Sequence, residues 1–450
     1  MTMERKVRGR VSRLSRRGFL KGAAAAGAAI AAPVVLPSSV FGASAPSNRI
    51  AVGCVGVGRM GTGDMRSVLG FGDVQVVAVC DVDSRRAANA KKIVESAYAS
   101  RKADGTFRGC AMTGDFREIV GRADVDAVTV VTPDHWHALP AIAAAEAGKD
   151  IFIQKPLTRT IPEGRALSDT VRRYGAVLQV GSQQRSDPRF RFACELVRNG
   201  RIGSLHTVHV GFGADPFTSP AEPTPPPEWL DYDYWLGPAP AVPYIEKRVQ
   251  PTSGYGRPGW LRTDDYCCGM ITGWGSHHMD IAHWGMGCEH GGPLTVQGTA
   301  EYAAEGPWDV HGKFRIEYTY PNGVRLICAD SRKVKQGVEF IGSEGTVYVR
   351  RGFIDAEPKS LLKSTIGPNE THLYRSRSHK GNWFECIRSR RETAAPVEIG
   401  HRSASACIVG NIAMKLDGRK LTWDAAAERF VGDDEANRML TRPMRTPWRL

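Results

Sequence analysis

The chain has 450 residues, of which roughly 400 follow a basic N-terminal segment, and this exceeds the size of one ordinary domain. Residues 1–45 contain eight Lys or Arg and one Glu, so they carry +7 of the formal net charge of +13 and leave about +6 for the rest. No basic cluster interleaved with aromatic residues follows residue 45, which argues against a nucleic-acid partner.

The first element in chain order is a predicted export signal. The run Ser15-Arg16-Arg17-Gly18-Phe19-Leu20-Lys21 precedes an alanine-rich stretch over residues 22–32 and small residues up to Ala45. This order is typical of a twin-arginine signal, and the apolar stretch is too short for a membrane span. We therefore expect a signal peptide over residues 1–45 that is cut between Val40 and Ala45. The twin-arginine translocase is then a partner, and the mature protein is periplasmic without a membrane span.

A dinucleotide-binding unit is predicted next. The apolar run Ile50 to Val55 is typical of a buried parallel strand, and Gly56-Val57-Gly58-Arg59-Met60-Gly61 follows it at the fingerprint spacing. The first glycine permits a tight turn, the second lets the backbone approach a pyrophosphate, and the third lets the next helix pack on its strand. The N-terminus of that helix then faces the phosphates, which its partial positive charge favours.

The second strand indicates which nucleotide is bound. Val74 to Cys80 forms another apolar run and delivers Asp81 about 20 residues after Gly61, where a carboxylate reaches the adenosine ribose. A carboxylate there repels a 2'-phosphate, so NAD is favoured over NADP, although Arg85 and Arg86 could offset the repulsion. The expected cofactor-binding residues of this segment are Gly56, Gly58, Arg59, Met60, Gly61, Asp81 and Arg85.

Polar chemistry follows the next two strands as well. We expect strands over Ala127 to Val131 and Ile151 to Ile153, with a helix over Trp136 to Ala147 between them. Ligands of open parallel sheets lie at the carboxyl ends of the strands, so the segments after both strands should face the nicotinamide. The candidates are Thr132, Pro133, His135, His137 and Lys155. An ammonium beside the nicotinamide can have a lowered pKa and can hydrogen-bond a substrate hydroxyl, whereas a surface lysine before a proline is the plain alternative.

With these motifs the chain resembles the Gfo/Idh/MocA oxidoreductase family, which includes glucose-fructose oxidoreductase and inositol dehydrogenase. The resemblance covers the whole predicted mature chain. It implies an α/β fold with a doubly wound Rossmann domain, then an α/β domain whose open, mostly antiparallel sheet often mediates oligomers, so we expect a homo-oligomer, dimer or tetramer. Its carriers are residues 56–61, Cys80-Asp81-Val82-Asp83, Thr132-Pro133-Asp134-His135-Trp136-His137, Gln154-Lys155-Pro156 and Gly275-Ser276-His277-His278-Met279-Asp280.

The chemistry that this resemblance implies is hydride transfer from a carbinol carbon to the nicotinamide. His277 would take the hydroxyl proton, and Lys155 would polarise the oxygen. Two positions depart from the family pattern, because Gln154 replaces a glutamate and Gly273 replaces the aspartate that commonly precedes the catalytic histidine by four residues. Another group must then orient His277. The candidates are Asp280, one helical turn on, and Asp264 or Asp265, while His278 and His283 are competing histidines.

The predicted substrate is a sugar, cyclitol or related polyol. Such molecules need fixed hydrogen bonds and an aromatic face, and Gln183-Gln184-Arg185 follows a strand-like run from Ala176 to Val180. A tryptophan buried in the core is the alternative to a binding platform. The predicted substrate-binding residues are Lys155, Gln183, Arg185, Trp274 and His277, and the predicted catalytic residues are Lys155, His277 and Asp280.

Two domains follow from the change of pattern along the chain. Strands alternate with helices before residue 180, and strand-rich sequence with turn signals begins after residue 295. We place the NAD-binding domain at residues 46–172 and the domain for substrate binding and oligomerisation at 173–450. The cysteines lie in apolar patterns typical of buried thiols, and Cys267-Cys268 lacks a second ligand pair at metal spacing, so no metal is expected.

Two other functions stay open. In the first, a bound NAD oxidises a sugar carbon transiently, which acidifies a neighbouring proton and permits glycoside cleavage or epimerisation before the hydride returns. In the second, the protein is a non-catalytic sugar or nucleotide binder, against which Lys155 and His277 argue. Because the periplasm has no ready pool of free NAD, we expect a cofactor that is loaded before export, held tightly and regenerated in place.

Overall fold

The apolar runs of the N-terminal part form a six-stranded parallel sheet in the order β3-β2-β1-β4-β5-β6. The structure, a computed structural model, describes residues 48–450, so the predicted signal peptide lies outside the described residues. The strand order runs outward in opposite directions from β1 and from β4. Doubly wound proteins bind nucleotides at this point of the sheet. The strands are β1 (Ile50–Val55), β2 (Val74–Cys80), β3 (Ala111–Thr113), β4 (Ala127–Val130), β5 (Asp150–Ile153) and β6 (Leu178–Val180).

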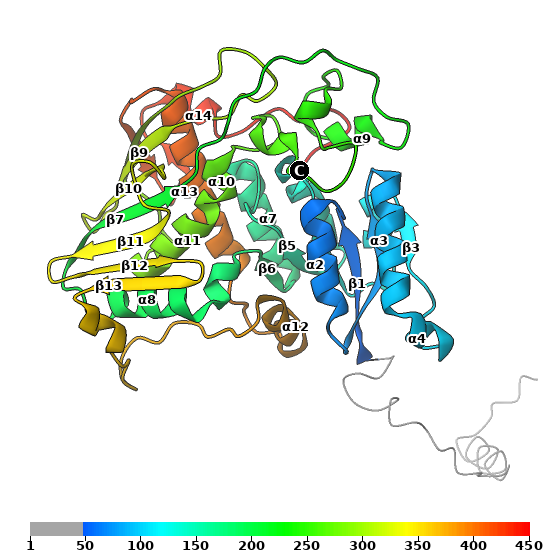
Figure 1. Cartoon of the computed structure of the whole chain (residues 1–450), viewed down its shortest axis with the longest axis horizontal. Helices are drawn as coiled ribbons and strands as arrows, with labels where there is room; N and C mark the ends of the chain where they lie inside the picture. Colours follow the sequence, from blue (N-terminus) through cyan, green and yellow to red (C-terminus); the bar gives the residue numbers. More distant parts are fainter. Residues whose placement is uncertain (1–47) are drawn as a thin grey trace, which may run out of the picture. The chain divides into compact units, whose positions relative to one another are not determined.

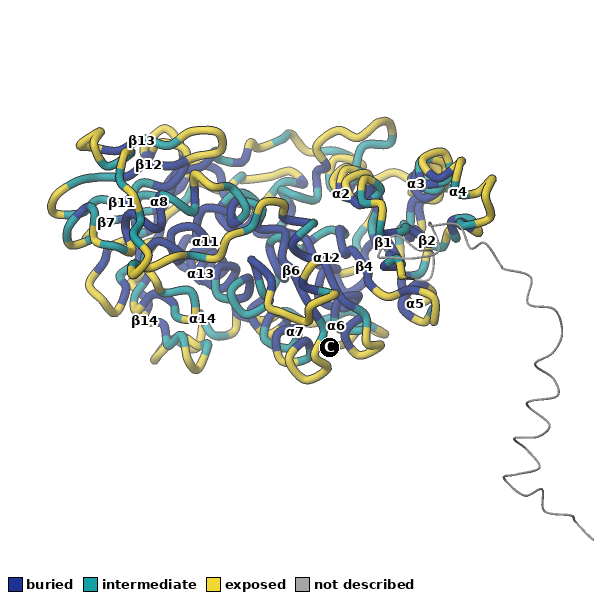
Figure 2. Tube along the Cα trace, turned by 90° about the horizontal axis from the view of Figure 1, so that it is seen from below, coloured by how far each residue is buried: buried dark blue, intermediate teal, exposed yellow. Residues whose placement is uncertain are grey.

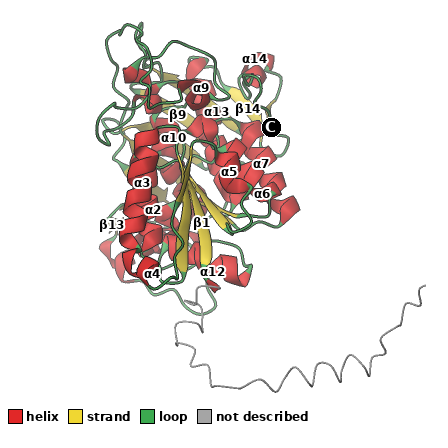
Figure 3. Cartoon of the chain, turned by 90° about the vertical axis from the view of Figure 1, so that its right-hand side faces the viewer, coloured by secondary structure: helices red, strands yellow, loops and turns green. Residues whose placement is uncertain are grey.

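Helices cover both faces of this sheet, with α2 and α3 on one side and α5, α6 and α7 on the other (Figure 3). Local signals fix their ends. The Asp83 side chain accepts hydrogen bonds from the first turn of α3, and α7 begins with a capping box of Thr160 and Glu163. The helices are α2 (Arg59–Leu69), α3 (Ser84–Ala97), α4 (Ala99–Ala103), α5 (Phe116–Val120), η3 (Asp134–Trp136), α6 (Ala138–Glu146) and α7 (Ile161–Tyr174).

The remaining strands form a second, nine-stranded sheet in the order β13-β12-β11-β7-β10-β9-β8-β14-β15. All its pairs are antiparallel except β7 with β10, so the predicted α/β fold with a mostly antiparallel second sheet is confirmed. The strands are β7 (Leu205–Phe212), β8 (Thr295–Ala300), β9 (Phe314–Thr319), β10 (Arg325–Asp330), β11 (Gly337–Gly342), β12 (Thr346–Arg350), β13 (Phe353–Glu357), β14 (Leu421–Asp424) and β15 (Arg429–Phe430).

One face of this sheet packs against α8 (Pro188–Arg198), α11 (Gly275–Met286) and α13 (Val397–Lys415). Alternate residues of β9 are buried, as expected for strands that have one face on a core. Both α11 and α13 run through the interior (Figures 1 and 2), and every residue of α11 except the last is buried. The other helices are η4 (Gln183–Ser186), α9 (Tyr232–Leu236), η5 (Glu246–Arg248), η6 (Gly259–Arg262), α10 (Met270–Gly273), η7 (Lys359–Lys363), α12 (His379–Ser389) and α14 (Asp434–Arg438).

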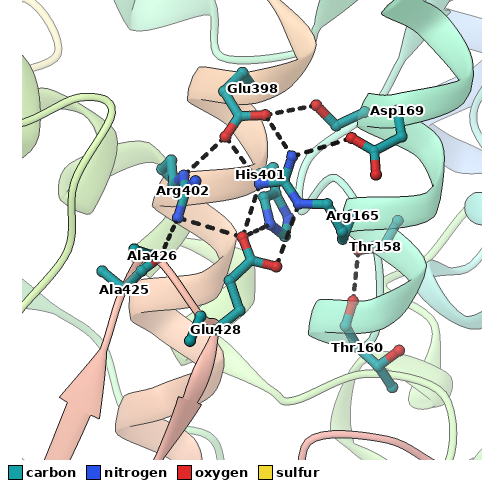
Figure 4. A network of polar contacts seen from close by, with 12 residues as sticks. Thr158, Thr160, Arg165, Asp169, Glu398, His401, Arg402, Ala425, Ala426 and Glu428 are labelled. Carbon is teal, nitrogen blue, oxygen red and sulfur yellow. Dashed lines mark hydrogen bonds and ion pairs between the residues drawn. The ribbon is translucent and has the colours of Figure 1, made fainter. Parts of the chain in front are cut away.

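A polar network ties α7 to α13 and to the β14–β15 hairpin (Figure 4). Arg165 of α7 forms ion pairs with Glu398 at 2.9 Å and with Glu428 at 2.7 Å, and the buried ring of His401 contacts Glu428 at 2.7 Å. Arg402 contacts both carboxylates. The network therefore joins α7, which covers the parallel sheet, to α13 and to the edge of the second sheet.

Candidate functional site

A cleft lies at the carboxyl ends of the parallel strands. Its walls come from the segments after β1, β2, β4 and β5, from residues 250–261 and from Trp274. The glycine-rich turn forms the first wall, where Gly56 has φ +80° and a Cβ atom would lie 2.6 Å from the carbonyl oxygen of Val131. A Cβ at Gly61 would overlap the Gly56 carbonyl. These two glycines are therefore required by close backbone packing, as predicted.

The N-terminus of α2 is open toward the cleft. Gly58 is its N-cap and has no side-chain capping bond, and the nearest atom to a Cβ built there is Nη1 of Arg86, at 4.0 Å. Gly58, Arg59 and Met60 line the cleft, whereas Gly61 supports the turn without lining it. Uncapped helix N–H groups beside an open surface fit a pyrophosphate.

Asp81 lines the cleft and also fixes its glycine-rich wall. Its carboxylate accepts hydrogen bonds from the backbone N–H groups of Val57, at 2.9 Å, and Asp83, at 3.0 Å. Burial raises the pKa of Asp81 to about 6, against the lowering effect of these two hydrogen bonds. The residue expected to bind the ribose is thus also the residue that sets the shape of the turn.

The two arginines after Asp81 have different environments. The Arg85 guanidinium lies 3.2 Å from the centre of the Trp229 ring and donates to the Thr252 carbonyl oxygen, and Arg85 does not line the cleft. Arg86 does line it, held by an ion pair with the fully buried Asp83 at 3.1 Å. Arg86 is therefore better placed than the predicted Arg85 to reach the adenosine end of a nucleotide.

The segment after β4 provides the next wall. Thr132, Pro133, Asp134 and His137 line the cleft, but His135 does not, because its ring packs against Trp235 and Tyr266 with centroids 5.4 and 4.9 Å away. His137 contacts two carbonyl oxygens, those of Pro156 and Thr132. The Thr132 hydroxyl and Oδ2 of Asp134 are buried without a protein partner. Unpartnered polar atoms on a cleft wall fit a polar ligand.

Lys155 lies at the end of β5 and lines the same cleft. Its backbone N–H donates to Oε1 of the buried Gln154 at 3.3 Å. Burial lowers the pKa of Lys155 from its usual value near 10.5, and the charge of Asp134 acts in the opposite direction. Lys155 is therefore a cleft residue with a shifted pKa and not an ordinary surface lysine.

His277 lies one step behind this wall, on α11. Its ring centroid is 5.9 Å from that of Trp274, which lines the cleft, and its Nδ1 atom is buried without a partner. Burial, and then the charges of Lys155 and Arg351, hold the pKa of His277 well below its usual value. The imidazole is thus neutral at physiological pH, as a general base must be.

Asp280 is committed to a partner other than His277. Its Oδ2 accepts a hydrogen bond from Nε of Arg185 at 2.7 Å, and its Oδ1 accepts one from the Ser403 hydroxyl at 3.2 Å. Arg185 also pairs with Glu289 at 2.8 Å, and the side chains of Arg185 and Asp280 are almost fully buried. This ion pair holds η4 against α11. Neither Arg185, predicted to bind substrate, nor Asp280, predicted to be catalytic, lines the cleft.

Asp264, another proposed partner of His277, is also occupied elsewhere. Asp264 pairs with Arg159 at 3.2 Å and with Lys415 at 2.6 Å. Gly273 leaves open space, since a Cβ there would have no heavy atom within 4 Å. His278 bonds the Gly211 carbonyl oxygen, and Gln183 is half-buried outside the cleft lining. Within residues 48–450, no carboxylate forms a hydrogen bond or ion pair with His277.

Sequence reasoning missed the segment that covers the cleft. Residues 230–266 form a small apolar core of their own around Trp235 and Tyr266, and residues 250–261 close one side of the cleft. The C-terminal residues brace this cover: Arg442 donates to the His135 carbonyl oxygen at 3.0 Å, and the Trp448 ring packs on Trp136 with centroids 4.7 Å apart. No short motif marks such a cover, because long-range packing creates it.

The described residues therefore fit a nicotinamide dinucleotide. An open helix N-terminus and a glycine turn face the phosphate position, a carboxylate lies at the ribose position, and a lysine with unpartnered polar neighbours lies at the other end. Within the same residues no three His, Cys, Asp or Glu side chains gather as a potential metal site. Over residues 48–450, no helix has the length and apolar character of a membrane span.

Family models match most of the chain. The model of the NAD-binding Rossmann fold of the Gfo/Idh/MocA oxidoreductase family matches residues 50–182, and that of its C-terminal α/β domain matches residues 217–450. A model of the twin-arginine signal sequence matches residues 13–33.

Individual relatives point to two kinds of chemistry. An inositol 2-dehydrogenase of Rhizobium meliloti is 26% identical over 302 residues, which cover 66% of this chain and 74% of that protein. A glycosyl hydrolase family 109 protein of Shewanella pealeana is 30% identical over 179 residues, which cover 36% and 38%. The structure of GenD2 from gentamicin A biosynthesis, in complex with NAD, has a TM-score of 0.58 at 19% identity, covering 84% of this chain and 97% of that one, so it shows the shared fold.

Proposed function

The chain belongs to the Gfo/Idh/MocA oxidoreductase family and is an NAD-binding enzyme that acts on CH–OH groups. From this premise we propose that it is exported and that it oxidises or reduces a sugar- or cyclitol-type polyol with a tightly held cofactor. One observation carries the proposal. Lys155 and Trp274 line the cleft that begins at the glycine-rich turn, and the neutral His277 packs directly on Trp274.

The side chains divide the chemistry between them. When bound, NAD accepts or returns a hydride at its nicotinamide ring. The Lys155 ammonium donates a hydrogen bond to the oxygen of the reacting carbinol and stabilises the negative charge that grows on it. His277 takes the hydroxyl proton, because its lowered pKa keeps a free lone pair on the ring. The Trp274 ring supplies an apolar face for the sugar.

Retention of the cofactor follows from the cover. Residues 250–261 lie over the cleft, and Arg442 and Trp448 brace the wall beneath them. A nucleotide under such a cover leaves slowly, which suits an enzyme that carries a twin-arginine signal and works outside the cytoplasm. We therefore propose a periplasmic enzyme that receives NAD before export and regenerates it with a second substrate. As part of the same proposal, the protein is a homo-oligomer that associates through its second sheet.

A redox-neutral enzyme is the second candidate, and the surroundings of His277 favour it. Among the described residues no carboxylate bonds to this histidine, so its proton-handling geometry would differ from the common family pattern. In this route transient oxidation by bound NAD would acidify a neighbouring C–H bond. Loss of that proton would expel the aglycone, which leaves as an alcohol, and water would then add; alternatively the proton would return on the opposite face. In both cases the same hydride would then be restored to the carbinol carbon. The match to a glycosyl hydrolase family 109 protein supports keeping this candidate.

Spectroscopy of the purified protein with its bound nucleotide separates the candidates. Net oxidation predicts reduced-nicotinamide absorbance when candidate polyols are added, whereas the redox-neutral route predicts cleavage of a chromogenic glycoside without net cofactor reduction. The Lys155→Ala variant should lose about 10²- to 10⁴-fold in either activity while it retains nucleotide. Full turnover by Lys155→Ala would exclude the proposed role, and no reaction with a broad panel in either assay would favour the non-catalytic binder.

A further inference from the structure

Two arginines are candidates for contact with a substrate in the cleft that Trp274 lines. Arg257 lines the cleft together with Trp274. The guanidinium of Arg351, from the turn after β12, lies 4.6 Å from the centre of the Trp274 ring. One arginine comes from the cover and the other from a hairpin of the second sheet, so two separate parts of the chain place positive charge at this point.

Neither arginine forms a close ion pair with a carboxylate of the described residues. Within the described residues, Arg351 forms no ion pair within 4 Å, and Arg257 comes no closer than 3.9 Å to Asp215, while its Nη2 donates to the sulfur of Met270 at 3.2 Å. Arg185 in the interior, by comparison, is paired closely with Asp280 at 2.7 Å. Arg257 on the cleft wall, and Arg351 over the ring of the cleft residue Trp274, therefore retain donors for a ligand.

Asp215 does not neutralise this charge. Its Oδ2 is held by the backbone N–H of Met270 at 2.6 Å, and its Oδ1 is buried without a hydrogen-bond partner. Arg262 also lies 3.8 Å from Oδ1, so two arginines share one remote carboxylate. Burial raises the pKa of Asp215 to about 6, which makes it a still weaker counter-charge below neutral pH.

The positive charge reaches the reacting groups. Burial has the largest effect on the pKa of Lys155 and lowers it, while the charge of Asp134 raises it. The charges of Arg351 and Arg257 have smaller effects and also lower it. Arg351 also contributes to the lowered pKa of His277, after burial and Lys155. The charges of both arginines thus act in the direction that disfavours further positive charge on Lys155, and that of Arg351 does the same for His277.

We propose that the substrate carries an anionic group, a carboxylate or a phosphate on a sugar or polyol, and that Arg257 and Arg351 bind this group on either side of Trp274. The inference rests on the proposed function, because it names the substrate class of the same cleft. An anion held by two arginines receives charge-assisted, forked hydrogen bonds that a neutral hydroxyl cannot match. It would also offset the local positive charge and orient the sugar ring against Trp274.

Calorimetric binding of defined sugars to the nucleotide-loaded protein tests this inference without requiring turnover. The probes are D-glucuronate, D-glucose 6-phosphate and D-glucose, measured against wild type, Arg257→Gln and Arg351→Gln. Arg350→Gln is the matched control, because the Arg350 guanidinium lies over Phe353 instead of Trp274. The nucleotide affinity of each variant is measured in parallel.

We expect an anionic probe to bind more tightly than glucose and each variant at 257 or 351 to weaken that binding by about 10- to 100-fold, with Arg350→Gln unchanged. The probe that binds distinguishes a carboxylate from a phosphate. Equal or tighter binding of glucose would overturn the inference, as would a loss confined to nucleotide affinity. Arginine-dependent binding of an anionic sugar without cofactor reduction would support the inference and count against net oxidation alone.

Discussion

Gln154 donates a hydrogen bond from Nε2 to Oδ2 of Asp64, at 2.8 Å, beneath the glycine-rich turn. The other oxygen of Asp64 pairs with the ammonium of Lys380 at 2.9 Å, and all three side chains are buried. A Cβ at Gly181 would lie 2.7 Å from Oε1 of Gln154, so the amide fills its site closely. The family pattern has a glutamate at position 154, but here the carboxylate at this place belongs to Asp64 of α2. A glutamine at position 154 can donate a hydrogen bond to that carboxylate.

Substitution of Gln154 by glutamate should destabilise the fold although it restores the family pattern. The new carboxylate would lie against that of Asp64 and would remove the hydrogen-bond donor, so we expect a loss of about 1–3 kcal/mol in the free energy of unfolding at pH 7. Denaturant unfolding measures it, with the exposed Gln336→Glu as a control of equal charge. An unchanged free energy in Gln154→Glu would contradict a stabilising contribution from this hydrogen bond.

Gly273→Asp should alter the pH dependence of the reaction. The site has room for a side chain, and an aspartate four residues before His277 would place a carboxylate one helical turn away. That charge should raise the pKa of His277, so the acidic limb of the kcat profile should move up by roughly 1–2 pH units. Gly273→Asn has nearly the same shape without the charge, and an equal shift in both variants would contradict the electrostatic explanation.

The cofactor affinity should depend on the ionisation of Asp81. Its pKa of about 6 means that the carboxylate is charged at pH 8 and becomes protonated as the pH falls through 6. Protonation weakens the hydrogen bonds from the Val57 and Asp83 backbone and those expected from the ribose. Titration with NAD should therefore give a higher dissociation constant at pH 5 than at pH 8, whereas Asp81→Asn should bind weakly at both values.

The network around Arg165 should contribute stability that is lost in acid. Burial opposes ionisation, but hydrogen bonds from His401 and Arg165 lower the pKa of Glu428 to about 2, and Arg165 and Ser168 likewise lower the pKa of Glu398. A lowered carboxyl pKa stabilises the fold above the unfolded value near 4.5, and this contribution disappears as the pH falls toward 2. Thermal unfolding of Arg165→Met should show a smaller difference between pH 7 and pH 3 than wild type, with the exposed Arg173→Met as the control.

Arg442 should govern how long the nucleotide stays bound. It donates to the carbonyl oxygens of His135 and Asp265 and pairs with Glu163 at 3.1 Å, so it ties the wall after β4 to the cover. Arg442→Ala should accelerate NAD release by roughly tenfold, since hydrogen bonds that involve charged groups are among the stronger ones. Stopped-flow displacement of bound NAD measures the rate. The exposed Arg438→Ala should leave it unchanged, and equal rates for both variants would exclude the bracing role.

Local patterns were sufficient for the parallel sheet. The predicted strands 50–55 and 74–80 coincide with β1 and β2, because buried parallel strands are continuous apolar runs whose ends the glycines and Asp81 mark. The sequence reading gave no strand over Leu205–Phe212, which is β7, in the middle of the second sheet. Its histidines and threonine interrupt the apolar pattern, and only its pairing with β10 and β11 reveals its place.

The candidate site divides in the same way. Residues within a short motif, such as Gly58, Asp81 and Lys155, line the cleft as expected. Arg185 and Asp280 looked like separate functional groups in the sequence, but the fold brings them together as an ion pair. Arg257 and Arg351 belong to no motif, and only the packing of the cover and of a hairpin turn on Trp274 identifies them. The roles of all these residues stay predictions.

The bracing by Arg442 and Trp448 has a consequence for the order of synthesis. The segment with the twin-arginine pattern leaves the ribosome first, whereas the wall that holds the nicotinamide end is completed only after residues 442–448 have emerged. The signal sequence is therefore synthesised long before the residues that close the cofactor site. Under the proposed loading of NAD before export, the nucleotide would therefore be held only by a chain whose C-terminal residues have already packed.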